Sequence, residues 1–292
     1  MPVLSFGTAG CNLACKYCQN WDMSKSRAME TLAEEASPQQ IAVAARELNC
    51  RSVAYTYNDP VIFMEYAIDV AQACHDLGIL SVAVTAGYIC GEPRETFFQH
   101  MDATNVDLKA FTERFYYQLT GAHLQPVLDT LRYIKQETST WLEITVLLIP
   151  DENDSDRELH ALSQWVYDNL GAKVPIHFTA FHPDWKMMHK SATALETLLR
   201  ARNIAMNTGL HYVYVGSVYV GNVHDKNASS TYCSQCHQRL IGRDWYVLTD
   251  WHLTHNGDCA FCGAHCEGIF DVKPGNWGSK LAYSNYTLCA LV

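Results

Sequence analysis

Short apolar or β-branched segments alternate along the chain with longer amphipathic segments. Six short segments predict β-strands, at residues 3–8, 51–57, 79–85, 103–109, 141–149 and 174–181. Five segments with helical periodicity lie among them, at residues 38–48, 61–77, 126–136, 156–170 and 192–208. Repeated strand–helix units predict an α/β fold with a parallel sheet and right-handed crossovers. Six strands are too few for a closed eight-stranded barrel, so the pattern favours a partial (β/α)6 TIM-like barrel.

Residues that favour helix ends support these boundaries. Ser37 is a suitable N-cap for a helix that has Pro38 at its first position. Gly78, Gly171 and Gly209 each follow directly on a predicted helix and are expected to end it.

Composition narrows the classes of function. The chain has 292 residues, of which 48% are hydrophobic and 18% charged, enough for one large α/β domain with a small appendage. A net charge of −10 without a Lys/Arg run argues against nucleic acid as a partner. No apolar stretch is long enough to span a bilayer, and no signal peptide is evident. The 12 cysteines therefore indicate metal ligands and buried thiols in a cytoplasmic protein.

Three cysteines form the most informative motif, Cys11-x3-Cys15-x2-Cys18, directly after the first predicted strand. Thiolates at this spacing can converge on one [4Fe-4S] cluster and leave the fourth iron open for chemistry. A zinc knuckle is the alternative, although zinc sites usually recruit a fourth Cys or His nearby.

Polar residues follow several predicted strands at their carboxyl ends, where parallel α/β folds gather their chemistry. Asn58-Asp59-Pro60 follows the second strand, although such a sequence can also be a simple turn that starts a helix. Asp107 and Lys109 alternate onto one face of the fourth strand. Glu143 lies in an otherwise apolar run and requires a partner, unless it sits at the strand's exposed start.

Four further cysteines predict a second metal site near the C-terminus. Cys233-x2-Cys236 and Cys259-x2-Cys262 can close a tetrahedral sulfur site, which favours structural zinc. Cys266 leaves open an auxiliary iron–sulfur cluster through a Cys-x2-Cys-x3-Cys run. We therefore expect a core at residues 1–228, a zinc-ribbon-like domain at 229–273 and a tail at 274–292.

The first cysteine motif, with Tyr17 before its last cysteine, resembles the signature of radical S-adenosylmethionine (SAM) enzymes. The resemblance implies that the amino and carboxylate groups of SAM chelate the open iron. Reductive cleavage of SAM would then release a 5′-deoxyadenosyl radical that abstracts hydrogen from a substrate. The family fold is a partial barrel, in agreement with the strand–helix pattern.

The same resemblance implies a set of SAM-binding residues. The family usually has Gly-Gly-Glu after the second strand, and Asn58-Asp59-Pro60 is close to an Asn-Glu-Pro version of that motif. Asp107-Leu108-Lys109, followed by Leu119-Thr120-Gly121, is similar to pyruvate formate-lyase activating enzymes. A histidine after the sixth strand contacts SAM in those enzymes, which favours His182 over His177. The implied SAM pocket is Lys16, Tyr17, Asn58, Asp59, Asp107, Lys109 and His182.

Over about residues 1–270 the chain resembles the AmmeMemoRadiSam-system radical SAM enzymes, on several motifs together. They are residues 7–12, 19–21, 57–60, 107–111 and 179–183 and the cysteine-rich region from residue 231. The resemblance implies AMMECR- and Memo-type partners, an electron donor and a substrate that is unknown, with a glycine of a partner protein as one candidate.

Two features depart from this family. Its members usually carry a cysteine-containing segment before the first strand, so this sequence is expected to be a fragment or a late start. A tandem unit at residues 213–217 and 218–222 is expected to be an insertion.

Two other classes of protein remain open at the level of sequence. One is an interaction module that binds zinc at both cysteine groups. The other is a nonradical iron–sulfur enzyme that uses the open iron as a Lewis acid.

Overall fold

The structure is a computed structural model that describes residues 2–26, 35–216, 225–244 and 247–273. The second half of the tandem unit, at residues 218–222, and the tail at 274–292 lie outside these residues. The chain forms two compact units, which are considered separately here. The first contains Met1–Leu142 and Pro183–Lys190, and the second contains Glu143–His182 and Ser191–Leu281.

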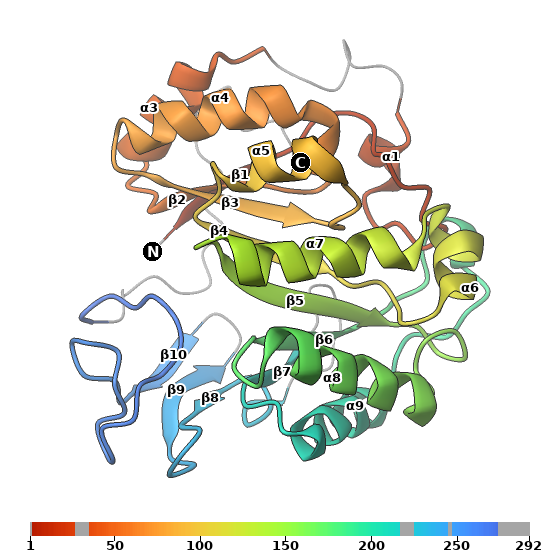
Figure 1. Cartoon of the computed structure of the whole chain (residues 1–292), viewed down its shortest axis with the longest axis vertical. Helices are drawn as coiled ribbons and strands as arrows, with labels where there is room; N and C mark the ends of the chain where they lie inside the picture. The colour runs from red at the N-terminus through yellow and green to blue at the C-terminus, as the bar shows by residue number, and fades with distance from the viewer. Residues whose placement is uncertain (1, 27–34, 217–224, 245–246, 274–292) are drawn as a thin grey trace. The chain divides into compact units, whose positions relative to one another are not determined.

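The first unit contains four parallel strands and the helices that connect them (Figure 1). The strands are β1 (Val3–Phe6), β2 (Ser52–Tyr55), β3 (Leu80–Thr85) and β4 (Ala103–Asp107). The larger helices are α3 (Pro38–Glu47), α4 (Met64–His75), α5 (Gly91–Phe98) and α7 (Leu124–Glu137). Shorter elements are α1 (Trp21–Ser24), the 3₁₀ helices η1 (Pro60–Phe63) and η3 (Trp185–Met187), α6 (Glu113–Phe115) and the π-helix η2 (Tyr116–Thr120). Helix α3 packs against α4, which in turn packs against β2 and β3.

The second unit continues the alternation of parallel strands and helices and then forms a small antiparallel sheet. Its parallel strands are β5 (Trp141–Leu148), whose first two residues belong to the first unit, β6 (Ile176–Ala180) and β7 (Val213–Gly216). The connecting helices are α8 (Asp156–Leu170) and α9 (Leu195–Thr208), which pack against each other. An antiparallel sheet follows, in the order β10–β9–β8, from β8 (Thr231–Tyr232), β9 (Arg239–Asp244) and β10 (Val247–Trp251).

The parallel α/β fold expected from the sequence is confirmed, with one correction to the strand count. Seven strands, β1 to β7, form the parallel sheet in chain order, against the expected six. The additional strand, β7, is the first half of the tandem unit that was expected to be an insertion. It pairs with β6 from Ile176–Val213 to Thr179–Gly216. Four residues are too few for a clear period-2 signal, so pairing with a neighbour decides this strand.

Local capping explains where the helices begin. The Ser37 hydroxyl accepts from the N–H of Gln40 at 3.3 Å, and the Gln40 side chain accepts from the N–H of Ser37 at 2.7 Å, so α3 starts with a capping box. The segment at 61–77, expected to be one helix, is instead η1 followed by α4. The break lies at Phe63, whose φ and ψ of −127° and 36° are not helical. Asp59 caps η1 by accepting from the N–H of Val61 at 3.1 Å.

Strand β5 shows how the core is built in the second unit. Its residues alternate between half-buried and buried, and the buried set is Leu142, Ile144, Val146 and Leu148. The period-2 alternation places these apolar side chains on one face of the sheet, while Glu143 and Thr145 lie on the other face. Burial of apolar surface on one face is the main term that stabilises such a layer.

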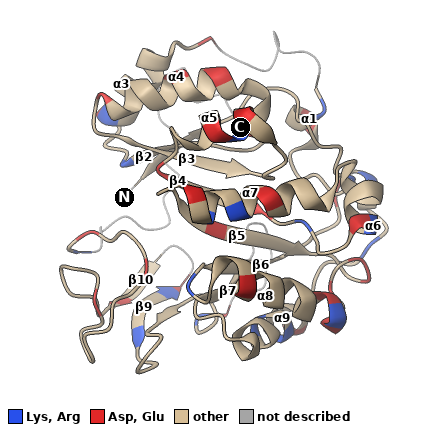
Figure 2. Cartoon of the chain, in the orientation of Figure 1, with Lys and Arg blue, Asp and Glu red and all other residues tan. Residues whose placement is uncertain are grey.

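The described helices carry charged residues of both signs. Helix α7 carries both acidic and basic residues along its length (Figure 2). Among the described helices, none has the length and apolar character that a membrane crossing requires.

Leu131 provides a test of the packing of α7. Its side chain is fully buried, so replacement by alanine removes apolar contacts and leaves a cavity. We expect Leu131→Ala to lower the free energy of unfolding by about 2–5 kcal/mol in chemical denaturation. Gln136→Ala, at an exposed position of the same helix, is the control and should change it by less than about 0.5 kcal/mol. Equal effects of the two substitutions would contradict the packing described here.

Candidate active site and metal centre

The three cysteines of the first motif lie on one loop between β1 and α1, in the first unit. Cys15 is buried, whereas Cys11 and Cys18 are partly exposed. The Cys18 thiol lies 3.0 Å from the hydroxyl of Ser24, in α1. The loop that carries these residues is called the cysteine loop below, residues 9–20.

Backbone hydrogen bonds fix the cysteine loop against the π-helix η2. The N–H of Ala14 donates to the carbonyl of Thr120 at 2.7 Å, and that of Lys16 donates to the carbonyl of Leu119 at 2.8 Å. The π-helix is a rare element that often occurs at functional sites. Here it presents two consecutive carbonyls to the loop on either side of Cys15.

The side chain of Asn58 holds the start of the cysteine loop. Its amide nitrogen donates to the Thr8 hydroxyl at 3.1 Å and to the Gly10 carbonyl at 2.9 Å, while its oxygen accepts from the N–H of Thr8 at 3.0 Å. Both N–H donors of this amide are therefore engaged with the protein. Gly7 allows this close approach: a Cβ at this position would lie 2.3 Å from the carbonyl oxygen of Thr56 and 2.5 Å from the side-chain oxygen of Asn58.

The electrostatic surroundings of Cys15 combine burial with nearby charges. Burial raises the pKa of the Cys15 thiol to about 11, an effect that the ammonium of Lys109 opposes. The Cys18 and Cys11 thiols raise this pKa further, and Lys25 again lowers it. A metal bound here must displace the thiol proton, and the two lysines favour the resulting negative charge.

Asp59 connects the ends of β2 and β3. One carboxylate oxygen accepts from the N–H of Val61 and from the Thr85 hydroxyl at 2.9 Å, and the other accepts from the N–H of Ala86 at 2.9 Å. Burial raises the pKa of Asp59, against these three hydrogen bonds, which favour its ionised form. The second oxygen, Oδ2, accepts one of these bonds and keeps capacity for another donor.

Asp107 and Lys109 form the ion pair that the strand pattern suggests. The Lys109 ammonium lies 2.6 Å from Oδ2 of Asp107, and Asn105 donates to Oδ1 of Asp107 at 3.1 Å. Burial alone would lower the pKa of Lys109, but Asp107 and then Cys15 raise it, and the net shift is upward. The backbone N–H of Lys109 donates to the hydroxyl of Tyr116, the first residue of η2, at 3.1 Å. This strand end and the cysteine loop therefore share η2 as a support.

The remaining residues of the predicted SAM pocket lie in three settings. Tyr17 is buried, its ring centroid is 5.7 Å from that of Phe115, and burial followed by Cys15 raises its pKa. The side chain of Lys16 is exposed. His182 is partly buried and follows β6 in the second unit. The structure thus brings Tyr17, Asp107 and Lys109 into the surroundings of Cys15, and the predicted role of His182 stays a prediction.

Sequence reasoning missed several residues that support the cysteine loop. Ser24 contacts Cys18, and the Lys25 ammonium donates to the carbonyl of Leu13 at 2.6 Å. Thr85, whose hydroxyl the sequence already places at the carboxyl end of the third predicted strand, donates to Asp59 at 2.9 Å. Ser24 and Lys25 belong to no motif, so only their position in the fold reveals them.

The four C-terminal cysteines converge in the second unit. The sulfur atoms of Cys233, Cys236, Cys259 and Cys262 all lie within 4.8 Å of one another. The Cys233 and Cys262 sulfurs are 3.6 Å apart, as are those of Cys236 and Cys259. The N–H of Gln235 points to the Cys233 sulfur at 3.4 Å. This arrangement can close around one tetrahedrally coordinated metal ion.

Hydrogen bonds to sulfur change the pKa of a thiol in this four-cysteine group, Cys233, Cys236, Cys259 and Cys262, which is called the knuckle below. Burial raises the pKa of Cys233, but the N–H groups of Cys236 and Gln235 outweigh it and lower the pKa to about 7. A thiolate is the form that ligates metals, so this shift favours ligation by Cys233. At Cys236 and Cys262, backbone hydrogen bonds lower the pKa, but burial and the neighbouring thiols outweigh them and raise it, so a metal must displace the protons of these two thiols.

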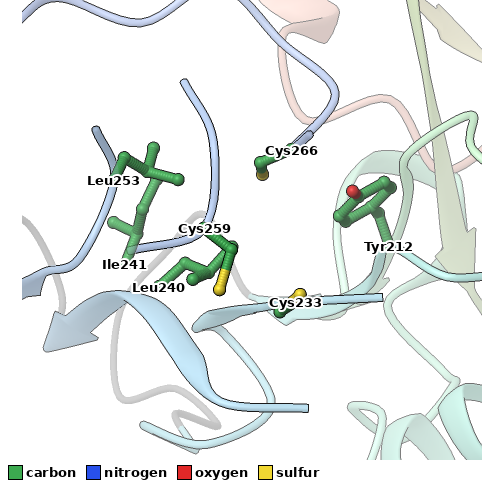
Figure 3. Close-up of a cluster of buried hydrophobic side chains, with 7 residues drawn as sticks. All are labelled: Tyr212, Cys233, Leu240, Ile241, Leu253, Cys259 and Cys266. Atoms are coloured by element: carbon green, nitrogen blue, oxygen red, sulfur yellow. The ribbon is translucent and has the colours of Figure 1, made fainter. Parts of the chain in front are cut away.

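The knuckle has its own small hydrophobic core (Figure 3). That core consists of Tyr212, Cys233, Leu240, Ile241, Leu253, Cys259 and Cys266. Cys266 is 1% exposed, is not in the four-sulfur group, and lies in this core, where burial raises its pKa to about 11. These observations favour a packing role for Cys266 over a ligand role.

A cavity of about 700 Å³ lies in the second unit, between α9, β7 and the start of the knuckle. Arg202, Tyr214, Tyr232 and Cys233 are among its lining residues. It contains none of the residues predicted to bind SAM. The cavity is therefore not part of the predicted SAM pocket.

A family model for the radical SAM superfamily matches residues 6–162, which is more than half of the chain and includes the cysteine loop. The chain belongs to the radical SAM superfamily. The match begins at Phe6, the last residue of β1, and covers strands β2 to β5, so the family and the observed fold agree.

The chain is also similar in sequence or in fold to individual known proteins. The chain is 37% identical to protein MJ0808 of Methanocaldococcus jannaschii, over 89% of this chain and 76% of that protein. It is 26% identical to the pyruvate formate-lyase-activating enzyme of Clostridium pasteurianum, over 59% of this chain and 72% of that protein. The crystal structure of Streptococcus suis SuiB bound to S-adenosylmethionine is similar in fold, with a TM-score of 0.59 at 13% identity, over 75% of this chain and 50% of that one.

Gly7 offers a test of the support beneath the cysteine loop. We expect Gly7→Ala to lower the free energy of unfolding by about 1–3 kcal/mol, because the added Cβ has no room between two oxygen atoms. Gly216→Ala is the matched control, because a Cβ there meets nothing within 4 Å. Chemical denaturation of both variants measures the difference. A Gly7→Ala variant as stable as the control would show that this contact does not constrain the loop.

Proposed function

We propose that Cys11, Cys15 and Cys18 hold a [4Fe-4S] cluster and that the adjoining residues bind S-adenosylmethionine. With both bound, one electron from an external donor would cleave SAM to methionine and a 5′-deoxyadenosyl radical, which would take a hydrogen atom from a substrate. The observation that carries this proposal is the set of three thiols on one fixed loop, in a chain of the radical SAM superfamily.

The residues around the cysteine loop fit such a group. A cluster with three thiolate ligands is anionic, and Lys109 and Lys25 both favour negative charge at Cys15. Hydrogen bonds from the N–H groups of Ala14 and Lys16 to the η2 carbonyls keep the loop backbone in place on both sides of Cys15. Preorganised surroundings of this kind let the protein orient a reactive group without rearrangement.

Each predicted SAM-binding residue receives a specific role. Asn58 positions the cysteine loop, because both of its N–H donors are already engaged there. Asp59 has spare acceptor capacity at Oδ2, which suits the ammonium group of SAM. Asp107 and Lys109 act as one ion pair that offers a carboxylate and an ammonium to the polar parts of the same molecule. His182 keeps the contact with SAM that the family resemblance implies.

Tyr17 and Lys16 complete the proposed pocket from within the cysteine loop. Tyr17 is buried against Phe115 and supports the loop next to Cys15. Lys16 is exposed, so a contact between its side chain and SAM would require the side chain to turn inward. We therefore assign Tyr17 an indirect role in SAM binding, through support of the loop. Lys16 has the weaker claim to a SAM contact, because its side chain is exposed.

We further propose that the four-cysteine knuckle binds structural zinc. Its four thiols leave no coordination position open, which is typical of structural zinc sites. The place of Cys266 in the hydrophobic core argues against the auxiliary iron–sulfur cluster.

A partner protein is the substrate class that we infer. The pyruvate formate-lyase-activating enzyme of Clostridium pasteurianum is named for its action on another enzyme. By analogy the radical would abstract hydrogen from a residue of a partner. The AMMECR- and Memo-type partners remain a prediction of the family resemblance.

Formation of 5′-deoxyadenosine tests the proposed function. The chain, reconstituted anaerobically with iron and sulfide and supplied with SAM and dithionite, should release 5′-deoxyadenosine, measured by liquid chromatography. Cys15→Ala should reduce this product to background, because it removes a cluster ligand. Cys90→Ala, at an exposed cysteine outside both motifs, should leave it unchanged. The proposal fails if the wild-type chain binds four irons and forms no product where a known radical SAM enzyme does.

Metal analysis tests the knuckle separately. The chain should contain one zinc ion that survives removal of the cluster, and Cys259→Ser should lose it. Because metal binding is coupled to folding, we expect the same variant to lower the Tm by more than about 5 °C.

Cys266→Ser is the matched control for the zinc site. It should retain the zinc ion, since Cys266 is not in the four-sulfur group. Loss of metal from Cys266→Ser, or iron in place of zinc in the wild-type knuckle, would favour the auxiliary cluster instead.

A further inference from the structure

The cavity of about 700 Å³ in the second unit combines a mostly apolar wall with two opposite charges. The described residues that line it lie between residues 199 and 237, within the second unit. Arg202 of α9 is the one lysine or arginine among them, and Asp225 is the one acidic residue. A cavity of this size, with a few polar groups in an apolar wall, is typical of sites that bind small organic molecules.

The guanidinium of Arg202 has donors that its neighbours do not use. Its Nε donates to the carbonyl of Val213 at 3.1 Å, and its two terminal nitrogens have no hydrogen-bond or ion-pair partner among the described residues. Burial lowers the pKa of Arg202, although Tyr232 and Asp225 act in the opposite direction. The surrounding groups therefore replace only part of the hydration that this cation loses, and an anionic group in the cavity would replace the rest.

Asp225 supplies the opposite charge in a fixed position. Its Oδ1 accepts from the N–H groups of Asn227 and Ala228, both at 2.8 Å. Its Oδ2 has no hydrogen-bond partner in the described part of the chain. Asp225 favours the charged form of Arg202, but no ion pair joins the two side chains within the described ranges. Two opposite charges that line one cavity without pairing suit a ligand that carries both charges.

Tyr214, in the wall of the cavity, is held in place before any ligand binds. Its ring stacks on that of His177, with the ring centroids 4.9 Å and the ring planes 22° apart. Its hydroxyl lies 3.0 Å from the Thr231 hydroxyl, and the Arg243 guanidinium lies 5.7 Å from the centre of its ring. A side chain that is already ordered loses little entropy when a ligand packs against it.

We propose that this cavity binds a free amino acid with a large apolar or aromatic side chain. The carboxylate of the ligand accepts from the terminal nitrogens of Arg202, and its ammonium group donates to Oδ2 of Asp225. The side chain of the ligand packs against the wall that contains Leu199, Met206 and Tyr214. No bond forms or breaks at this site. The inference does not depend on the proposed radical chemistry, because no lining residue belongs to the predicted SAM pocket.

The two charges favour such a zwitterion over a simple anion or cation. An anion without an ammonium group brings a second negative charge beside Asp225, and a cation brings a second positive charge beside Arg202. An amino acid pairs with both residues and adds no net charge to the cavity. The volume of the cavity favours a large side chain, because a small amino acid would leave much of the apolar wall without contacts.

Isothermal titration of the full chain, with its metals bound and without SAM, tests the proposal. L-Tryptophan is the first probe. N-Acetyl-L-tryptophan lacks the ammonium group and L-tryptophanamide lacks the carboxylate, so the two analogues isolate the two charges. We expect L-tryptophan to bind and each analogue to have a Kd about tenfold higher, because each loses one charge-assisted interaction.

Two substitutions assign these interactions to residues. Arg202→Gln should raise the Kd for L-tryptophan about tenfold and leave that for L-tryptophanamide unchanged, since the amide has already lost the interacting group. Asp225→Asn, which keeps Oδ1 for the turn, should raise the Kd for L-tryptophan similarly and leave that for N-acetyl-L-tryptophan unchanged.

Arg200→Gln is the matched control for the loss of a positive charge. Arg200 lies on the same helix, pairs with Asp154 and Asp156 and does not line the cavity, so this variant should bind L-tryptophan as wild type does. Circular dichroism verifies that the Arg202 variants fold. Arg202→Lys, which keeps the charge, should bind L-tryptophan more tightly than Arg202→Gln.

Each other outcome overturns the proposal. Absence of binding by L-tryptophan, L-tyrosine, L-phenylalanine and L-methionine excludes the ligand class. Binding that Arg202→Gln and Asp225→Asn leave unchanged lies elsewhere in the protein, for example at the metal of the cysteine loop. Equal affinity for L-tryptophan and N-acetyl-L-tryptophan would make the ligand a simple anion. The proposed function is tested separately, because Arg202→Gln should form 5′-deoxyadenosine at the wild-type rate without added amino acid.

Discussion

The candidate active site depends on one constraint, the fit of the Asn58 amide against the backbone that enters the cysteine loop. Its three hydrogen bonds connect the ends of β1 and β2, and they form only because Gly7 leaves room for them. A buried amide that is fully engaged in this way has few alternative arrangements. The position of Cys11 and the loop after it follows from this contact.

The loop is then fixed from segments far away in the sequence. The π-helix at Tyr116–Thr120 supplies carbonyls on both sides of Cys15, and the segment around Trp185 binds the Lys16 carbonyl. Charged side chains from distant segments also act on the loop. Lys109 and Lys25 lower the pKa of Cys15, and Asp107 forms an ion pair with Lys109. Rigid support and positive charge are what a loop needs to hold an anionic metal group.

The knuckle also consists of cysteines, but as a group of four that face one another. Its four thiols face one another over a small core that contains Tyr212 and Leu240. A domain of this size buries little apolar surface, so a metal ion would add the stability that its core lacks. In the proposed assignment, the three cysteines of the first loop leave one coordination position open, whereas the four thiols of the knuckle close the coordination sphere.

The sequence by itself determined the parallel α/β fold, the two cysteine groups and the Asp107–Lys109 pair, because period, spacing and strand alternation are local properties. It failed at β7, at the break near Phe63 and at η2, where short segments take their form from neighbouring strands and loops. It also identified Asn58 but not its contacts, and it missed Ser24 and Lys25. Only the tertiary structure brings these residues to the cysteine loop, because hydrogen bonds and charges between distant segments have no sequence period to reveal them.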